Sequence, residues 1–194
     1  VREMQIPRVP NPPVFIPLSL DPPVNLPYRQ ALMPSFSPKA VKEMEEKIRH
    51  WAQQIVADVA DGGECDFVRD VSELFPVSIF MELMGMDLSR LREFRDLAET
   101  FFHVQNDAAK LGEVSGRIIG IMTEYIEQKK THPDNGLISQ LLKARINDRP
   151  IEMGELQNMC FLLFAGGLHT VTNVLGFSYW QLAQMPALQQ RLAA

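Results

Sequence analysis

Prolines are concentrated in the first fifth of this 194-residue chain. Ten of the 14 prolines lie between Pro7 and Pro38, whereas the first glycine is Gly62. An internal proline removes a backbone N–H donor and clashes with the preceding helical turn. This part of the chain therefore cannot form long helices, and we expect residues 1–20 to be irregular or extended.

Two helix starts follow this segment. Asp21 precedes Pro22-Pro23 and Ser37 precedes Pro38, so each start offers a capping side chain followed by proline in the first turn. After the second start, apolar residues recur at spacings of three and four, which predicts a helix that ends at Gly62-Gly63. This stripe consists of Val41, Met44, Ile48, Trp51, Ile55 and Val59.

Further helices are expected through the rest of residues 21–152. The apolar pattern predicts them at residues 71–84, from a cap at Asp87 to about residue 102, at 107–130 and at 137–145. The turn sequence NDRP at residues 147–150 separates Ile146 from Ile151, which predicts a small hairpin. The expected fold class is mainly α with minor β.

The last long element is the most informative one. Residues 153–185 contain no proline and keep a helical pattern, so they could form one helix of about 33 residues, roughly 50 Å long. Its centre, from Cys160 to Leu168, is nearly all apolar. We therefore expect that centre to be buried on all sides.

Composition excludes several classes of protein. The net charge is −5 and no basic tract is interleaved with aromatic residues, so nucleic acid is not an expected partner. The longest run without charges or strong turn formers is about half of what a membrane span needs, so no membrane anchor is expected. Cys65 and Cys160 form no metal-binding or disulfide pattern. These features favour a soluble, cytoplasmic protein.

A pair of glycines interrupts the centre of the long helix. Gly166 and Gly167 should each cost about 0.5–1 kcal/mol relative to alanine, so something must offset that cost. One face of this helix carries Leu162, Ala165, Gly166, His169, Thr170 and Asn173. The turn at Ala165 and Gly166 carries almost no side-chain atoms, so a planar ligand could lie against it. The Thr170 hydroxyl could donate a hydrogen bond to the Gly166 carbonyl, four residues earlier. Alternatively, the glycines only let another helix approach closely, and the histidine and threonine are satisfied core residues.

Two motifs resemble one known family. The string LFAGGLHTVTN at residues 163–173 resembles the distal oxygen-binding helix of the cytochromes P-450, the haem-thiolate monooxygenases, whose usual pattern is Ala/Gly-Gly-x-Asp/Glu-Thr. Upstream, DPPVNLPYR at residues 21–29 resembles the family segment Asp-Pro-Pro-Glu-His-x-x-x-Arg. With FIP at residues 15–17, the chain looks closest to the soluble bacterial camphor-hydroxylase-like branch.

The resemblance assigns roles to individual residues. Arg29 matches the arginine that pairs with a haem propionate; the alternative is a surface salt bridge. Asn25 stands where the family usually has a histidine on the other propionate, and it could still donate as a neutral amide. Ala165 and Gly166 match the residues over the haem face. Thr170 matches the threonine that organises proton delivery.

His169 departs from the family pattern. The family usually has an acid at this position, which gates protons into the site, whereas histidine is an imidazole that titrates near neutral pH. We hypothesise that His169 still relays protons, with a different pH dependence. The alternative is a histidine turned away into a helix contact.

The resemblance also implies an apolar substrate pocket. Such a pocket favours a small hydrophobe such as a terpene or an aromatic compound. Phe101 and Phe102 could close its roof, or could be plain core residues. The expected substrate contacts are Phe15, Leu18, Leu162, Ala165, Phe101 and Phe102.

The family's proximal half of the site has no counterpart here. A cysteine thiolate in a Phe-x-x-Gly-x-His/Arg-x-Cys-x-Gly loop is the iron ligand, because thiolate donation favours cleavage of the O–O bond. No such loop occurs in the 194 residues. The iron ligand is therefore expected beyond Ala194, and no metal ligand is expected within the 194 residues.

We therefore expect residues 1–194 to form a partial cytochrome P-450 fold, an incomplete single haem-monooxygenase domain. It would comprise an irregular pocket-lining segment (1–20), a helical body (21–152) and the long distal helix (153–185). The complete protein would carry haem b and hydroxylate a hydrophobic substrate with electrons from a ferredoxin-type partner. The fragment itself would not be competent. The alternative is a non-catalytic helical small-molecule-binding or interaction module derived from the family.

Overall fold

The computed structural model describes residues 15–193, which form helices and one small hairpin. The fold class expected from the sequence, mainly α with minor β, is confirmed. The α-helices are α1 (Leu26–Leu32), α2 (Pro38–Ala60), α3 (Leu74–Met84), α4 (Leu91–His103), α5 (Ala108–Thr131), α6 (Leu137–Leu142), α7 (Met153–Gly167), α8 (His169–Ala183) and α9 (Pro186–Ala193). Short 3-10 turns at Met33–Phe36 and Leu88–Arg90 and a π-helical turn at Val68–Ser72 connect some of them. The strands β1 (Arg145–Ile146) and β2 (Arg149–Pro150) pair antiparallel.

The prolines limit helix formation at the start of the described chain. α1 begins at Leu26, with Asn25 as its N-cap residue, so the helix start expected at Asp21 is wrong. A proline is tolerated only in the first turn of a helix, and Pro27 occupies that turn in α1. The helix therefore cannot begin several residues earlier, and the backbone N–H of Asn25 instead closes a turn on the Asp21 carbonyl at 3.3 Å.

The helix starts predicted at Ser37, Asp87 and Asp107 are confirmed by the structure. The hydroxyl of Ser37 accepts a hydrogen bond from the Ala40 N–H at 3.2 Å and starts α2, as predicted. The carboxylates of Asp87 and Asp107 accept backbone N–H bonds in the same way before α4 and α5. Gly85 ends α3 with φ +75°, a conformation that glycine adopts without strain. The hairpin turn is formed by Asn147 and Asp148, both with positive φ.

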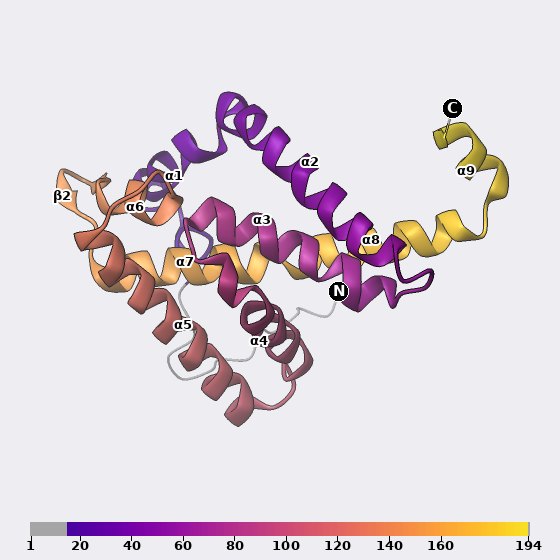
Figure 1. The fold of residues 1–194 in the computed structure, drawn as a ribbon. Helices are drawn as coiled ribbons and strands as arrows, with labels where there is room; N and C mark the ends of the chain where they lie inside the picture. Colours follow the sequence, from indigo (N-terminus) through magenta and orange to yellow (C-terminus); the bar gives the residue numbers. More distant parts are fainter. Residues whose placement is uncertain (1–14, 194) are drawn as a thin grey trace, which may run out of the picture.

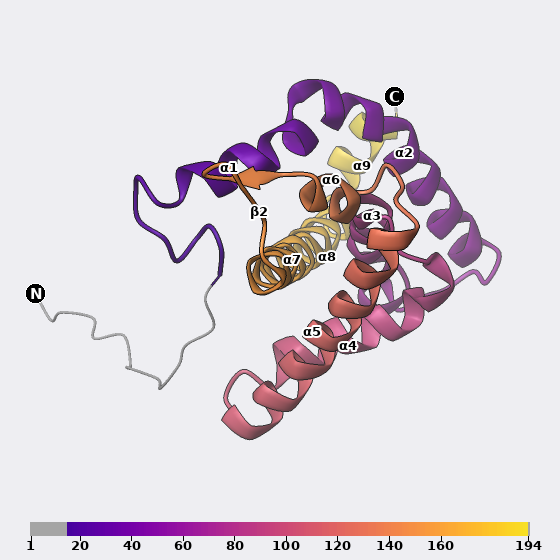
Figure 2. The ribbon, with the colours of Figure 1, turned by 90° about the vertical axis from the view of Figure 1, so that its left-hand side faces the viewer.

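The core lies where α3, α4, α5, α6 and α7 meet. Figure 2 looks nearly along α7 and α8, with α2 and α3 on one side of this axis and α4 and α5 on another. The helix predicted at residues 107–130 is observed as α5, and the buried residues on its inner face are Ile118, Ile121, Met122, Tyr125 and Ile126. Figure 1 shows α7 and α8 running in line across the molecule, so they form the axis on which the other helices pack.

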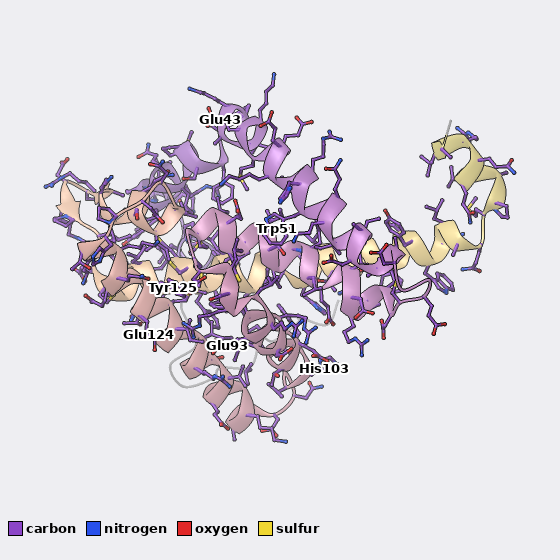
Figure 3. The ribbon with its side chains drawn as sticks, in the orientation of Figure 1. Glu43, Trp51, Glu93, His103, Glu124 and Tyr125 are labelled. Carbon is purple, nitrogen blue, oxygen red and sulfur yellow. The ribbon has the colours of Figure 1, made fainter. Side chains whose placement is uncertain are left out.

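Ionic and aromatic contacts fix α4 against α5. The Arg90 guanidinium pairs with Glu93 at 2.7 Å and with Glu124 at 3.5 Å, and it lies 5.7 Å from the centre of the Tyr125 ring. Figure 3 labels Glu93, Glu124 and Tyr125 where the two helices face each other. This distance is within the range of a cation–π interaction, which adds to the ion pairs.

The predicted single long helix is broken at Leu168. This residue has φ −98° and ψ −65° and separates α7 from α8. The side chains of Cys160 and Phe164 are buried as expected, but Gly166 and Gly167 are exposed and α8 has no buried residue among those described. The expectation of burial on all sides from Cys160 to Leu168 is therefore wrong. Glycines weaken the helix locally, and side chains that bond to the backbone compete with its ladder of hydrogen bonds.

The residues Met153–Ala183 are long and apolar enough to cross a membrane by length and composition. A core helix of a soluble protein satisfies the same criterion. In α7, the side chains of Leu156, Met159, Cys160, Phe161 and Phe164 pack into the core.

Candidate functional site

The candidate site is the junction between α7 and α8. The Thr170 hydroxyl donates to the Gly166 carbonyl at 3.0 Å, the bond expected from the sequence. The N–H and the hydroxyl of Thr172 both donate to the Leu168 carbonyl, each at 3.1 Å. The Leu168 side chain is 2% exposed, so it anchors the junction in the core. These hydroxyls satisfy carbonyls at a helix break and hold the break in a defined shape.

The glycines at this junction do not serve a close packing contact within the described chain. A Cβ added at Gly166 or Gly167 would meet no heavy atom within 4 Å, and both residues are exposed. By contrast, a Cβ at Gly136 would lie 2.6 Å from the Gly85 Cα, so those two glycines do permit a close backbone approach. The alternative in which Gly166 only admits a neighbouring helix is therefore not seen among residues 15–193. The bare turn instead offers a flat face that a planar group can cover.

The two polar residues expected on α1 differ in their bonding. Arg29 is exposed and takes part in none of the ion pairs found among the described residues, so the surface salt bridge considered for it is not seen there. The Asn25 side-chain amide donates to the Leu20 carbonyl at 3.0 Å and so stabilises the turn before α1. One amide hydrogen of Asn25 remains for another acceptor.

A hydrogen-bonded cluster around the Glu155 carboxylate, which was not predicted from the sequence, connects α1 to the start of α7. The Tyr28 hydroxyl donates to Glu155 Oε1 at 2.5 Å. Both terminal nitrogens of Arg149 donate to the same carboxylate, at 2.8 and 2.5 Å. The pKa of Glu155 is lowered to about 2, mainly by the hydrogen bonds from Arg149 and against the cost of burial. The spacing of Glu152 and Glu155 matches a helix-capping pair, which was the local signal available in the sequence.

The side chain of His169 packs against α4. Its ring stacks on Phe102, with ring centres 4.2 Å apart and an angle of 15° between the planes. The helix contact considered as the alternative for His169 is thus present. Both rings border a cavity of about 270 Å³ between α3, α4 and α8.

Four ionisable side chains line the same cavity. They are Glu73, Arg95, Glu99 and His103, and Figure 3 labels His103 at the end of α4. Burial raises the pKa of Glu73, and the neighbouring Glu99 carboxylate raises it further. His169 therefore borders the same cavity as Glu73, whose carboxyl group holds its proton to a higher pH than usual.

The expected substrate-contact residues do not all lie in one place. Phe15 stacks on Phe161 with 5.8 Å between ring centres, and Leu162 and Ala165 are partly buried on α7. Leu18 is 74% exposed. Phe101 is buried in the core, in edge contact with Phe161 and Phe164, so the structure matches the core interpretation of this residue. The Phe101 ring also meets the Phe102 ring edge to face, with 5.0 Å between ring centres.

The two cysteines differ in accessibility. Cys65 is exposed, whereas Cys160 is buried in α7, where burial raises the pKa of its thiol to about 12. Among the described residues, no group of three or more His, Cys, Asp or Glu side chains is placed to hold a metal ion.

Comparison with known proteins identifies the family. The chain is 27% identical over 174 residues to linalool 8-monooxygenase of Pseudomonas putida, a match that covers 87% of this chain and 43% of that protein. Vitamin D(3) 25-hydroxylase of Pseudonocardia autotrophica is 26% identical over 189 residues, covering 97% and 46%. The crystal structure of CYP101J2 matches with a TM-score of 0.80 and 30% identity over 92% of this chain and 44% of that one. In sequence and in fold, most of the chain is thus similar to the cytochromes P-450.

Other comparisons agree with this similarity at the level of the fold. A mutant of the cytochrome P-450 EryK in complex with erythromycin B has a TM-score of 0.84 at 24% identity, over 95% of this chain and 48% of that one. No family model matches the chain. The chain spans less than half the length of the curated relatives named above. Haem is the cofactor of the cytochromes P-450 and hence of the complete protein, and the exposed Gly166, where an added Cβ meets no heavy atom within 4 Å, leaves room for a planar group of that kind.

Proposed function

We propose that the complete protein is a haem-dependent monooxygenase that inserts one oxygen atom from O2 into a small hydrophobic substrate. The observation that carries this proposal is the α7/α8 junction, where the exposed Gly166 face has no packing partner within 4 Å of an added Cβ and the Thr170 hydroxyl bonds to the Gly166 carbonyl. In this proposal residues 1–194 belong to a single haem-monooxygenase domain of a cytoplasmic protein, and a ferredoxin-type partner supplies the electrons.

The residues of the chain would hold haem from two directions. The Arg29 guanidinium would pair with one propionate, as a bidentate donor suits a carboxylate, and the second amide hydrogen of Asn25 would serve the other. Ala165 and Gly166 would lie over the ring. Haem supplies the activation of oxygen, and Thr170 would hold a proton donor beside that chemistry.

The proximal thiolate would come from outside these 194 residues. Cys160 is a poor ligand because its thiol, with a pKa raised to about 12 by burial, stays protonated at neutral pH inside α7. Cys65 is exposed in the loop between α2 and the π-helical turn and lacks the sequence pattern of a haem-ligand loop. We propose that a further segment of the complete protein provides the cysteine.

His169 would relay protons in place of the usual acid. Its position between Phe102 and the cavity that Glu73 and Glu99 border supports a route from solvent to the junction. Replacement His169→Asp in the full-length protein should raise the amount of product formed per NAD(P)H consumed. Unchanged coupling in His169→Asp would count against a relay role.

The substrate is proposed from the apolar side chains near the junction. Phe15, Leu162 and Ala165 present only apolar groups and are partly buried, which favours a small hydrophobe such as a terpene. A relative whose name is linalool 8-monooxygenase supports this class of substrate. We also propose that the protein belongs to the camphor-hydroxylase-like branch of the family.

A spectrum of the full-length protein tests the proposed function. The reduced, CO-bound difference spectrum should show a thiolate-type Soret band, because haem with a proximal cysteine gives this signature. A folded protein that shows no such band in the presence of haem would contradict the monooxygenase proposal. That result would favour the non-catalytic binding module.

A further inference from the structure

α1 is attached to the rest of the molecule through Tyr28, which is buried, and through Ala31 and Leu32, which pack partly buried against the core. The helix has only seven residues, and Tyr28 is its one buried residue among those described. A helix this short is not stable in isolation. The direction in which α1 presents its exposed residues therefore depends on its contacts with the core, and the Tyr28 hydroxyl provides a directional one by donating to Glu155.

Tyr28 docks on a carboxylate whose hydrogen-bonding capacity is filled. Glu155 accepts one bond from Tyr28, two from Arg149 and one from the Glu152 backbone N–H, all between 2.5 and 2.8 Å. The Glu155 side chain is 13% exposed. Charge-assisted bonds of this kind have a narrow geometry, so the carboxylate fixes the position of the Tyr28 hydroxyl.

The carboxylate belongs to the helix that carries the candidate site. Glu155 is in the first turn of α7, and Ala165 lies ten residues later, roughly 15 Å along the same helix. Arg29 directly follows Tyr28 on α1. One carboxylate therefore connects the residue proposed to hold a haem propionate with the helix face proposed to cover the haem ring.

We propose that Glu155, together with Tyr28 and Arg149, positions α1 relative to α7 so that Arg29 and the Gly166 face meet the same haem. Glu155 and Tyr28 are positioning residues, and they act on the cofactor through Arg29. This inference rests on the proposed function, because it needs the propionate role of Arg29.

The test uses Tyr28→Phe in the full-length, haem-loaded protein. This change keeps the buried ring and removes only the hydroxyl. We expect haem transfer to an excess of apomyoglobin to accelerate roughly five- to tenfold, the effect of losing a hydrogen bond to a charged group. Amide hydrogen exchange should also become faster within residues 26–32, with no change in α5. The matched control is Tyr179→Phe, because Tyr179 is 50% exposed and takes part in none of the side-chain hydrogen bonds found among residues 15–193.

A double variant separates this inference from the proposed function. Arg29→Gln should accelerate haem loss, and Tyr28→Phe combined with Arg29→Gln should be no worse than Arg29→Gln alone. Haem loss at the wild-type rate in Arg29→Gln would overturn the propionate role and this inference with it. Accelerated loss in Arg29→Gln, but not in Tyr28→Phe, would overturn the positioning role alone. Additive effects of the two changes would likewise show that Tyr28 does not act through Arg29.

Discussion

Removing the charge of Glu155 should destabilise the protein more at neutral pH than in acid. The pKa of this carboxyl is lowered from 4.5 to about 2, mainly by the two hydrogen bonds from Arg149. A depressed pKa means that the folded state binds the proton more weakly than the unfolded state does. The stabilisation is therefore fully present above pH 4.5 and is lost as the pH falls toward 2.

The size of this effect follows from the two pKa values. Their difference of about 2.5 corresponds to roughly 3 kcal/mol, and the partial exposure of Arg149 reduces that to roughly 2 kcal/mol. Urea unfolding of Glu155→Gln at pH 7 should show this loss in the free energy of unfolding. At pH 3 the difference from the wild type should be clearly smaller, because the wild-type advantage is already fading.

A surface ion pair provides the control for this experiment. Glu127 pairs with Lys130 at 2.7 Å, and both side chains are about half exposed. Glu127→Gln should change the free energy of unfolding by less than about 0.5 kcal/mol at either pH. An equal loss for Glu155→Gln at pH 7 and pH 3, or no loss at pH 7, would refute the reasoning about the Glu155 carboxylate.

Two further predictions concern packing and thiol accessibility. Gly136→Ala should lower the free energy of unfolding by about 1–3 kcal/mol, because its Cβ would lie 2.6 Å from the backbone of Gly85. Gly116→Ala, whose added Cβ would meet open space, should be neutral or slightly stabilising. Equal effects of the two changes in urea unfolding would contradict this prediction. A thiol reagent should label Cys65 rapidly in the folded protein. Cys160 should react only on unfolding, because it is buried and its pKa is raised to about 12. Mass spectrometry of the labelled peptides measures both rates, and fast labelling of Cys160 would mean that α7 opens readily.

The elements that could be predicted from the sequence are those specified by neighbouring residues. Ser37 and Asp107 cap their helices because the acceptor and the N–H groups lie within three residues of each other. The bond from Thr170 to Gly166 was predictable for the same reason, since residues four apart in a helix are neighbours. The start of α1 and the break at Leu168 were missed, because several weak local signals compete there and the packing of distant residues decides between them.

The site was predictable only where spacing along one helix was enough. Phe101 and Phe102 are identical residues in sequence terms, yet one packs in the core and the other stacks on His169. The Tyr28–Glu155 bond joins residues 127 positions apart, and no periodicity reports such a contact. Side-chain direction and long-range pairing require the folded chain, whereas helix caps and helix faces do not.

The central claim is that the bare turn at Gly166 is the face that covers haem. CO affinity of the reduced full-length protein tests it most directly in Gly166→Leu, with Gly116→Leu as a matched helical glycine that also has no neighbour within 4 Å of an added Cβ. Both variants should fold, and Gly166→Leu should bind CO at least roughly tenfold more weakly, a loss of about 1.4 kcal/mol. Gly116→Leu should bind CO like the wild type. Wild-type CO affinity in Gly166→Leu would contradict the claim.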